Sequence, residues 1–219
     1  PGLGVGGVTL RHRKSGSAPD IHDPNDVAAV DAERFYATND QGSTTSFGRT
    51  LEAYLQLPRA SVAYWDGSTA RIVAHELKYA NGVALSNDGS TLYVAEATGR
   101  TLKIYARDTA TGALSLTNQV FLGTGLDNLD VDDKGSIWVG AHPHLLAFVA
   151  HAGDAAKLSA SQILRLDPKD GGQAGEAHTV YLDLGAEISG SSVGVSANGH
   201  LLIGSVFESK IVDCTLPAS

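Results

Sequence analysis

Residues 81–97 read NGVALSNDGSTLYVAEA, and this pattern is the strongest indication of the fold. Two short apolar runs flank Asn87-Asp88-Gly89, a segment typical of a tight turn because Asn and Gly tolerate the positive φ angles that such turns require. The flanking runs contain Val, Leu and Tyr, residue types that favour strands. The stretch therefore predicts a β-hairpin.

The same pattern recurs in three other parts of the chain. The matching segments are NDVAAVDAERFYATND (25–40), DNLDVDDKGSIWVGAH (127–142) and SSVGVSANGHLLIGSV (191–206). The units begin at residues 25, 81, 127 and 191, so they lie 56, 46 and 64 residues apart, a spacing that suits four-stranded propeller blades with their loops. The repeats predict an all-β fold, a β-propeller with about four blades in this chain.

The segments between the hairpins would supply the outer strands of each blade. Apolar runs predict strands at residues 61–65, 70–74, 101–106, 162–166 and 179–182, while residues 153–160 and 169–175 read as loops. Residues 49–57 have a helix-like spacing of apolar positions and predict a short helix. No second domain or low-complexity linker is evident, so we expect residues 1–219 to form a single, partial propeller domain.

Composition and charge narrow the range of functions. Hydrophobic residues make up 42% of the chain and charged residues 18%, values typical of a globular protein. The formal net charge of −8 argues against a nucleic-acid partner, which requires a basic face. No run of about 18 apolar residues occurs, so the sequence predicts no transmembrane segment.

Polar residues stand at the same position in successive units, namely Asn25-Asp26, Asn81 and Asp127-Asn128. Equivalent positions on the innermost strands of a propeller converge on its central channel, so these side chains are expected to meet around one axis. Their oxygens suit a hard cation such as Ca²⁺, whereas a softer metal would require His or Cys. The alternative is that the Asn and Asp residues only cap strands or form turns. Agreement among three positions favours a calcium site.

Two of the eight histidines stand near this expected channel. His142 follows the second strand of the third unit, where it either reaches the channel mouth and contacts a substrate or is a turn residue beside Pro143. His22 lies before the first unit and either lines the same mouth or belongs to a solvated loop. The chain has no GxSxG, P-loop or HExxH motif, so any catalysis is expected to depend on the metal.

Several motifs together resemble the paraoxonase (arylesterase/lactonase) family. They are residues 23–30 with 35–40, Tyr79-Ala80-Asn81-Gly82-Val83, residues 126–132, Trp138-Val139-Gly140-Ala141-His142-Pro143, and residues 202–207 through Cys214. Their order and spacing agree along nearly the whole chain from about Thr9. A more distant likeness is to the gluconolactonase and strictosidine-synthase-like propellers.

The resemblance implies a six-bladed propeller with two calcium ions in its central tunnel, one catalytic and one structural. The matching motifs imply the catalytic-calcium ligands Asn25, Asn81, Asp127 and Asn128, and they make Asp26 a ligand of the structural ion. By the same resemblance His142 would lie in the active-site wall together with Asp40 and Tyr79. Asp127 and His142 are the expected catalytic residues.

The departures from the family pattern imply a missing N-terminal portion. An acidic ligand pair and a histidine pair proposed as general base belong to the family's first blades, and the matching part of this sequence begins after both. Cys214 matches a family cysteine that pairs with one near the N-terminus, and such a disulfide would imply export. We therefore expect the chain to cover roughly the C-terminal two-thirds of a paraoxonase-like domain.

The resemblance implies a calcium-dependent hydrolase whose partners are small-molecule lactones or aryl esters. One alternative is a non-catalytic propeller that binds a ligand on its face, because this fold hosts many functions. Another is a related propeller enzyme that acts on sugar lactones. Oxygen-bearing residues around the axis favour an enzyme, since a scaffold has little need for a metal site there.

Overall fold

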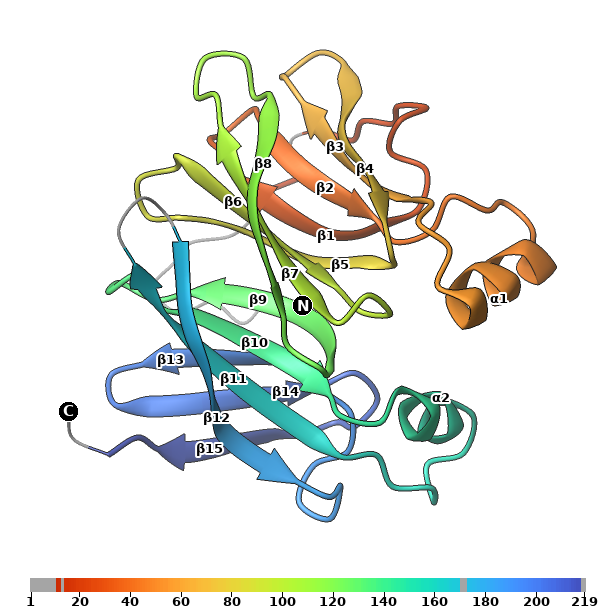
Figure 1. The fold of residues 1–219 in the computed structure, drawn as a ribbon, viewed down its shortest axis with the longest axis vertical. Helices are drawn as coiled ribbons and strands as arrows, with labels where there is room; N and C mark the ends of the chain where they lie inside the picture. Colours follow the sequence, from red (N-terminus) through yellow and green to blue (C-terminus); the bar gives the residue numbers. More distant parts are fainter. Residues whose placement is uncertain (1–10, 13, 170–172, 218–219) are drawn as a thin grey trace.

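The computed structural model describes residues 11–12, 14–169 and 173–217, and its strands form four antiparallel sheets (Figure 1). The first contains β1 (Pro24–Ala29), β2 (Phe35–Asn39), β3 (Ala60–Trp65) and β4 (Ala70–Leu77). The second contains β5 (Ala80–Leu85), β6 (Thr91–Glu96), β7 (Thr101–Arg107) and β8 (Leu114–Phe121). The third contains β9 (Gly125–Val131), β10 (Ile137–His142), β11 (Ser161–Lys169) and β12 (Gln173–Asp183), and the fourth contains β13 (Ser191–Ala197), β14 (His200–Ser205) and β15 (Ile211–Thr215).

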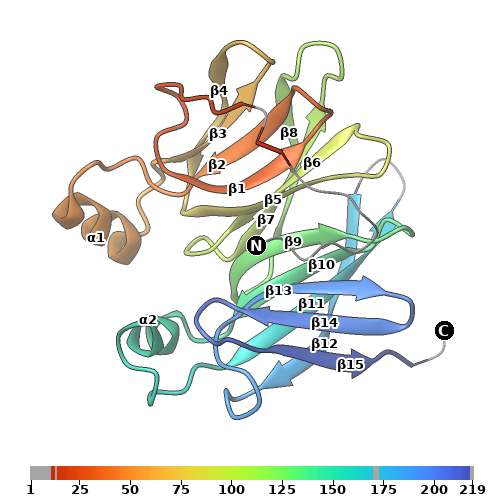
Figure 2. The ribbon, with the colours of Figure 1, turned by 180° about the vertical axis from the view of Figure 1, so that it is seen from behind.

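Each sheet is one propeller blade, so the predicted all-β propeller with four blades is confirmed. The first strands of successive blades, β1, β5, β9 and β13, lie side by side in the interior of the array (Figures 1 and 2). The helices α1 (Ser46–Leu55) and α2 (Leu145–Gly153) both project from the same end of the blades. The β9–β10 hairpin turn lies at the opposite end.

The core lies between neighbouring blades rather than within one sheet. One cluster joins Tyr36, Val62 and Tyr64 of the first blade to Val83, Leu92 and Val94 of the second. The next joins the second and third blades through Leu102, Ile104, Leu129 and Val139, and the last joins the third and fourth through Trp138, Ile163, Leu201 and Ile203. Because each such side chain contributes roughly 1.5–3 kcal/mol when fully buried, the blades depend on one another for stability.

The hairpin turns have the conformation that their residues favour. Gly89, Gly135, Asn198 and Gly199 all have positive φ, from 52° to 82°. In the first hairpin, the carboxylate of Asp31 accepts hydrogen bonds from the backbone N–H groups of Glu33 and Arg34. Local turn chemistry therefore explains why the repeats fold as hairpins.

Parts of the outer structure differ from the predictions. The short helix is present as α1, but α2 and β8 were not predicted. The sequence of α2, LLAFVAHAG, is apolar on all sides and so lacks the amphipathic period by which a helix is recognised. The predicted loop at 169–175 is wrong at Lys169 and at Gln173–Gly175, which lie in β11 and β12, while residues 170–172 lie outside the described residues.

Neither helix of the described part of the chain is long and apolar enough to cross a bilayer.

Candidate functional site

A cavity of about 730 Å³ opens at the end of the blades where the two helices lie. Its polar residues come from the inner strands and the strand ends, and they include Asn25, Asn81, Asp127, Asn128 and His142. These include all four residues expected to bind a catalytic cation. Residues more than 100 positions apart in the sequence are thus brought to one site by the packing of β1, β5 and β9.

A β-bulge at the same place in each inner strand explains why these side chains converge. Pairing skips Asn25 and Asp26 in β1, Asn81 and Gly82 in β5, and Asp127 and Asn128 in β9, so that two residues oppose one on the second strand of each blade. In β13 the pairing skips Ser192. A bulge redirects side chains out of the regular alternation of the strand. Ser192 is therefore the fourth blade's equivalent of the Asn and Asp residues, and the sequence did not single it out.

The hydrogen bonds observed among the described residues do not use the carbonyl oxygens of the site's carboxamides. Asn25 donates its Nδ2 to Asp40 Oδ2 at 3.2 Å, and Asn128 donates its Nδ2 to Ser192 Oγ at 2.8 Å. Asn81 is only 8% exposed, and its Oδ1 is buried without a hydrogen-bond partner among the described residues. Because an unsatisfied buried oxygen costs free energy, this atom is a natural place for a ligand.

Asp127 and His142 form a buried pair in the third blade. Asp127 Oδ2 lies 2.9 Å from His142 Nε2, and both residues are at most 6% exposed. When the imidazole is neutral, the carboxylate holds the proton on Nε2 and leaves Nδ1 as an acceptor. His142 Nδ1 is buried and has no partner in the described structure.

An apolar wall faces this polar set. The His142 ring stacks on Phe148 of α2 with 3.8 Å between ring centroids, and Phe148 packs against Phe207 at 5.4 Å. Leu145, Leu146, Val149 and Val206 complete the wall. The sequence predictions missed the α2 residues of this wall because α2 was not recognised as a helix.

Asp26 lies behind the cavity, where it joins two blades. Its Oδ1 accepts a hydrogen bond from the N–H of Val27 at 2.7 Å, and its Oδ2 accepts one from the N–H of Val83 at 2.9 Å. Burial raises the pKa of the Asp26 carboxyl, although these backbone hydrogen bonds oppose the shift. The residue therefore ties β1 to β5 in the described structure.

Tyr79 and Asp40 occupy the edge of the site next to Asn25. Tyr79 lines the cavity from a turn in which its φ is 58°, and Asp40 contacts Asn25 without lining the cavity itself. Burial raises the pKa of Asp40 to about 6, and the neighbouring Asp23 adds to the rise while the hydrogen bond from Asn25 opposes it. Burial, together with the nearby Asp40 carboxylate, also raises the pKa of Tyr79.

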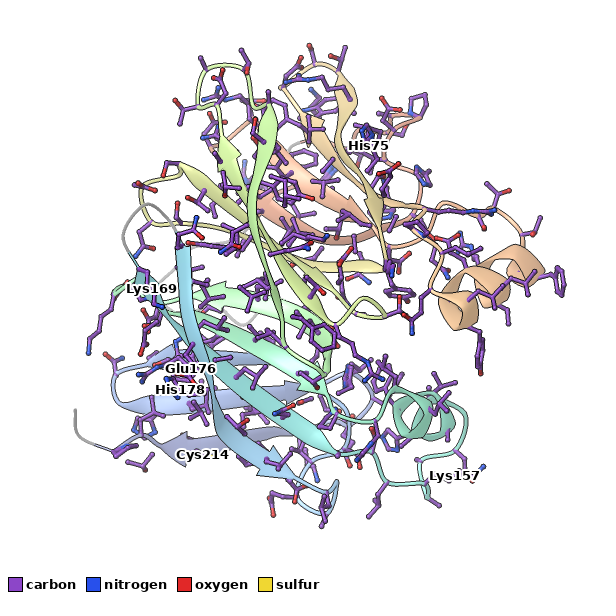
Figure 3. The ribbon with its side chains drawn as sticks, in the orientation of Figure 1. His75, Lys157, Lys169, Glu176, His178 and Cys214 are labelled. Atoms are coloured by element: carbon purple, nitrogen blue, oxygen red, sulfur yellow. The ribbon has the colours of Figure 1, made fainter. Side chains whose placement is uncertain are left out.

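His22, two further histidines and Cys214 lie away from this cavity. His22 Nε2 is hydrogen-bonded to the backbone oxygen of Gln41, and His22 does not line the cavity. Figure 3 shows His75 and His178 on separate blades, and neither lines the cavity. Cys214 lies half-buried on β15 and forms no disulfide within the described residues.

The donor set fits a hard cation. Three carboxamides and one carboxylate offer oxygen ligands, which is the chemistry that Ca²⁺ prefers. Among the residues that the structure describes, no three His, Cys, Asp or Glu side chains gather into a metal-binding group, so a carboxamide-rich set is the candidate. Four side chains supply fewer than the six to eight oxygens that Ca²⁺ takes, so water or further groups would complete the shell.

Solved structures of other proteins share this fold. A protein from Lactobacillus plantarum matches with a TM-score of 0.58 and 15% identity, over 88% of this chain and 51% of that one. A gluconolactonase from Xanthomonas campestris matches with a TM-score of 0.50 and 23% identity, over 83% of this chain and 54% of that one. These likenesses support the propeller fold.

Sequence relatives identify the family. The human serum paraoxonase/arylesterase 1 is 33% identical over 95% of this chain and 56% of its own length, and the chicken serum paraoxonase/arylesterase 2 is 34% identical over 84% and 51%. The chain thus spans about half the length of these relatives. The family model described as Arylesterase matches residues 7–216, which include every residue of the candidate site. With this match along nearly its whole length, the chain belongs to the arylesterase family.

Proposed function

We propose that this chain carries the active site of a calcium-dependent hydrolase of lactones and aryl esters. The observation that carries the proposal is the buried Asn81 Oδ1, which has no hydrogen-bond partner in the described part of the chain and belongs to a residue that shares one cavity with Asn25, Asp127 and Asn128. Family membership supports a hydrolase, and the oxygen-rich donor set supports the calcium. The adjoining apolar wall would hold the rest of an ester or lactone.

Asn25, Asn81, Asp127 and Asn128 would hold the ion in this proposal. Bound Ca²⁺ would supply a Lewis acid that polarises the ester carbonyl and stabilises the negative charge that develops on its oxygen. Asp127 orients the imidazole of His142 through the 2.9 Å hydrogen bond to Nε2. His142 Nδ1 then accepts the proton of the attacking water, and Phe148 keeps the ring in place by stacking. Asp26 is proposed as a ligand of a second, structural calcium.

Removing calcium is expected to stop hydrolysis reversibly. The measurement is the rate of cleavage of phenyl acetate and of a γ-lactone by the purified chain, first in calcium, then in excess chelator, then after calcium is restored. Calorimetric titration with calcium gives the affinity independently of activity. Chelator-resistant hydrolysis would contradict the calcium dependence, and calcium binding with no hydrolysis of either substrate would contradict the hydrolase.

Replacement of His142 by Gln is expected to lower kcat by about 100-fold, the lower range for loss of a general base. The Gln amide can still donate a hydrogen bond to Asp127, so calcium affinity should stay close to that of the unchanged chain. Rates at several pH values and a calcium titration test the two effects separately. If calcium affinity falls together with kcat, His142 acts by maintaining the calcium site rather than by accepting a proton from the attacking water.

A further inference from the structure

We propose that Arg100 forms an anion-binding subsite at the rim of the cavity and that the preferred ester or lactone carries a negatively charged group. The inference rests on the proposed hydrolase and deepens it by naming a substrate class. Among the described residues that line the cavity, Arg100 is the only Lys or Arg.

Arg100 has no acidic partner among the described residues. No ion pair joins it to a carboxylate in the described part of the chain, although the protein has 24 acidic and 16 basic residues. Within the described residues its side chain makes one hydrogen bond, from Nη1 to the backbone oxygen of Gly123 at 3.3 Å. Since a guanidinium has five N–H donors, most of them remain for a ligand.

The loop that presents Arg100 is held in place before any ligand arrives. Arg100 itself has a φ of 54°, and its backbone oxygen accepts a hydrogen bond from the N–H of Leu122 at 2.9 Å. At the start of the loop, the N–H of Ala97 donates to the backbone oxygen of Tyr79 at 2.9 Å. A side chain on such a preorganised loop loses less freedom on binding than one on a mobile loop.

The buried carboxylate of Glu96 anchors the same loop from below. Glu96 is 3% exposed, and its Oε1 accepts a hydrogen bond from the N–H of Lys78 at 2.9 Å. The N–H of Gly99 in turn donates to the backbone oxygen of Lys78 at 3.4 Å, and a Cβ at Gly99 would lie 2.7 Å from Glu96 Oε2. The loop is thus packed closely over Glu96. This packing fixes the position of the Arg100 backbone, from which the side chain extends.

Two further polar residues line the same cavity as Arg100. Thr98 lies on the same loop, and Gln56 caps the C-terminus of α1 with a φ of 52°; both residues line the cavity. A hydroxyl, a carboxamide and a guanidinium together suit a carboxylate or phosphate, because all three can donate hydrogen bonds to an anionic oxygen. The α2 wall of the same cavity is apolar, so the lining suits a molecule with one charged and one apolar part.

Two esters that differ by one charge test the proposal. The substrates are phenyl acetate, which is neutral, and 4-acetoxybenzoate, which carries a carboxylate. In Arg100→Gln the ratio of kcat/KM for the charged ester to that for the neutral ester is expected to fall by about tenfold, the size of a charge-assisted contact at a partly exposed site. Arg100→Lys keeps the charge but not the planar fork, so the ratio should fall less. The effect should shrink in high salt.

The matched control is Lys134→Gln, which removes the same charge from an exposed hairpin at the opposite end of the blades and should leave the ratio unchanged. An equal fall in Lys134→Gln would show long-range attraction and overturn the subsite, as would an unchanged ratio in Arg100→Gln. If neither ester is cleaved, the proposed hydrolase fails. The subsite is then tested by calorimetric titration with 4-hydroxybenzoate and with phenol. Arg100→Gln should bind 4-hydroxybenzoate more weakly than the unchanged chain does, and it should bind phenol equally well.

Discussion

Replacement of Asp127 by Ala is expected to abolish calcium-dependent hydrolysis and to weaken calcium binding by more than about 100-fold, or about 3 kcal/mol. Asp127 is the one carboxylate among the four proposed ligands that line the cavity, so its loss removes the only full negative charge from that set. The same change leaves His142 Nε2 without its 2.9 Å partner. Calorimetric calcium titration and the rate of lactone cleavage measure the two consequences.

Two further variants separate this effect from a loss of folding. Asp127→Asn keeps the size of the side chain and an oxygen that can accept the hydrogen bond from His142, so the fold should persist while calcium affinity still falls. Asp133→Ala removes an exposed carboxylate from the hairpin turn at the far end of the same blade and should change neither property. Near-normal hydrolysis in Asp127→Ala would remove Asp127 from the site.

Replacement of Gly82 by Ala is expected to lower the free energy of unfolding by about 3 kcal/mol and to impair calcium binding as well. A Cβ on Gly82 would lie 2.6 Å from the backbone oxygen of Asp127 and 2.7 Å from both Asn128 Cα and Leu129 N. All three atoms belong to the backbone of β9, so no rotation of a side chain relieves the contact. Strands β5 and β9 must separate, and they carry Asn81, Asp127 and Asn128 apart as they do so.

Thermal unfolding and calcium titration of Gly82→Ala test this expectation against Gly153→Ala. A Cβ on Gly153, at the end of α2, meets no atom of the described residues within 4 Å, so the control should be as stable as the unchanged chain. If Gly82→Ala unfolds at the same temperature as that control and binds calcium equally well, the close approach of β5 and β9 does not define the site.

The sequence by itself determined the hairpins, the number of blades and the polar residues at the start of each repeat. These features depend on neighbours in the chain. Asn and Gly fix the turns through their tolerance of positive φ, and alternating β-favouring residues fix the strands around them. Asn25, Asn81 and Asp127 could be named as a set because a repeat places equivalent residues at equivalent positions in space.

Only the tertiary structure showed how these side chains are oriented and which residues lie next to them. The bulges depend on pairing between strands, and the Asp127–His142 hydrogen bond depends on the packing of β9 against β10. Arg100 looks like an ordinary loop residue in the sequence, and α2 has no amphipathic period to reveal it. Arg100 and α2 gain their roles from contacts with other blades and loops. The free energy of such contacts depends on distances across the fold, which the order of residues along the chain does not reveal.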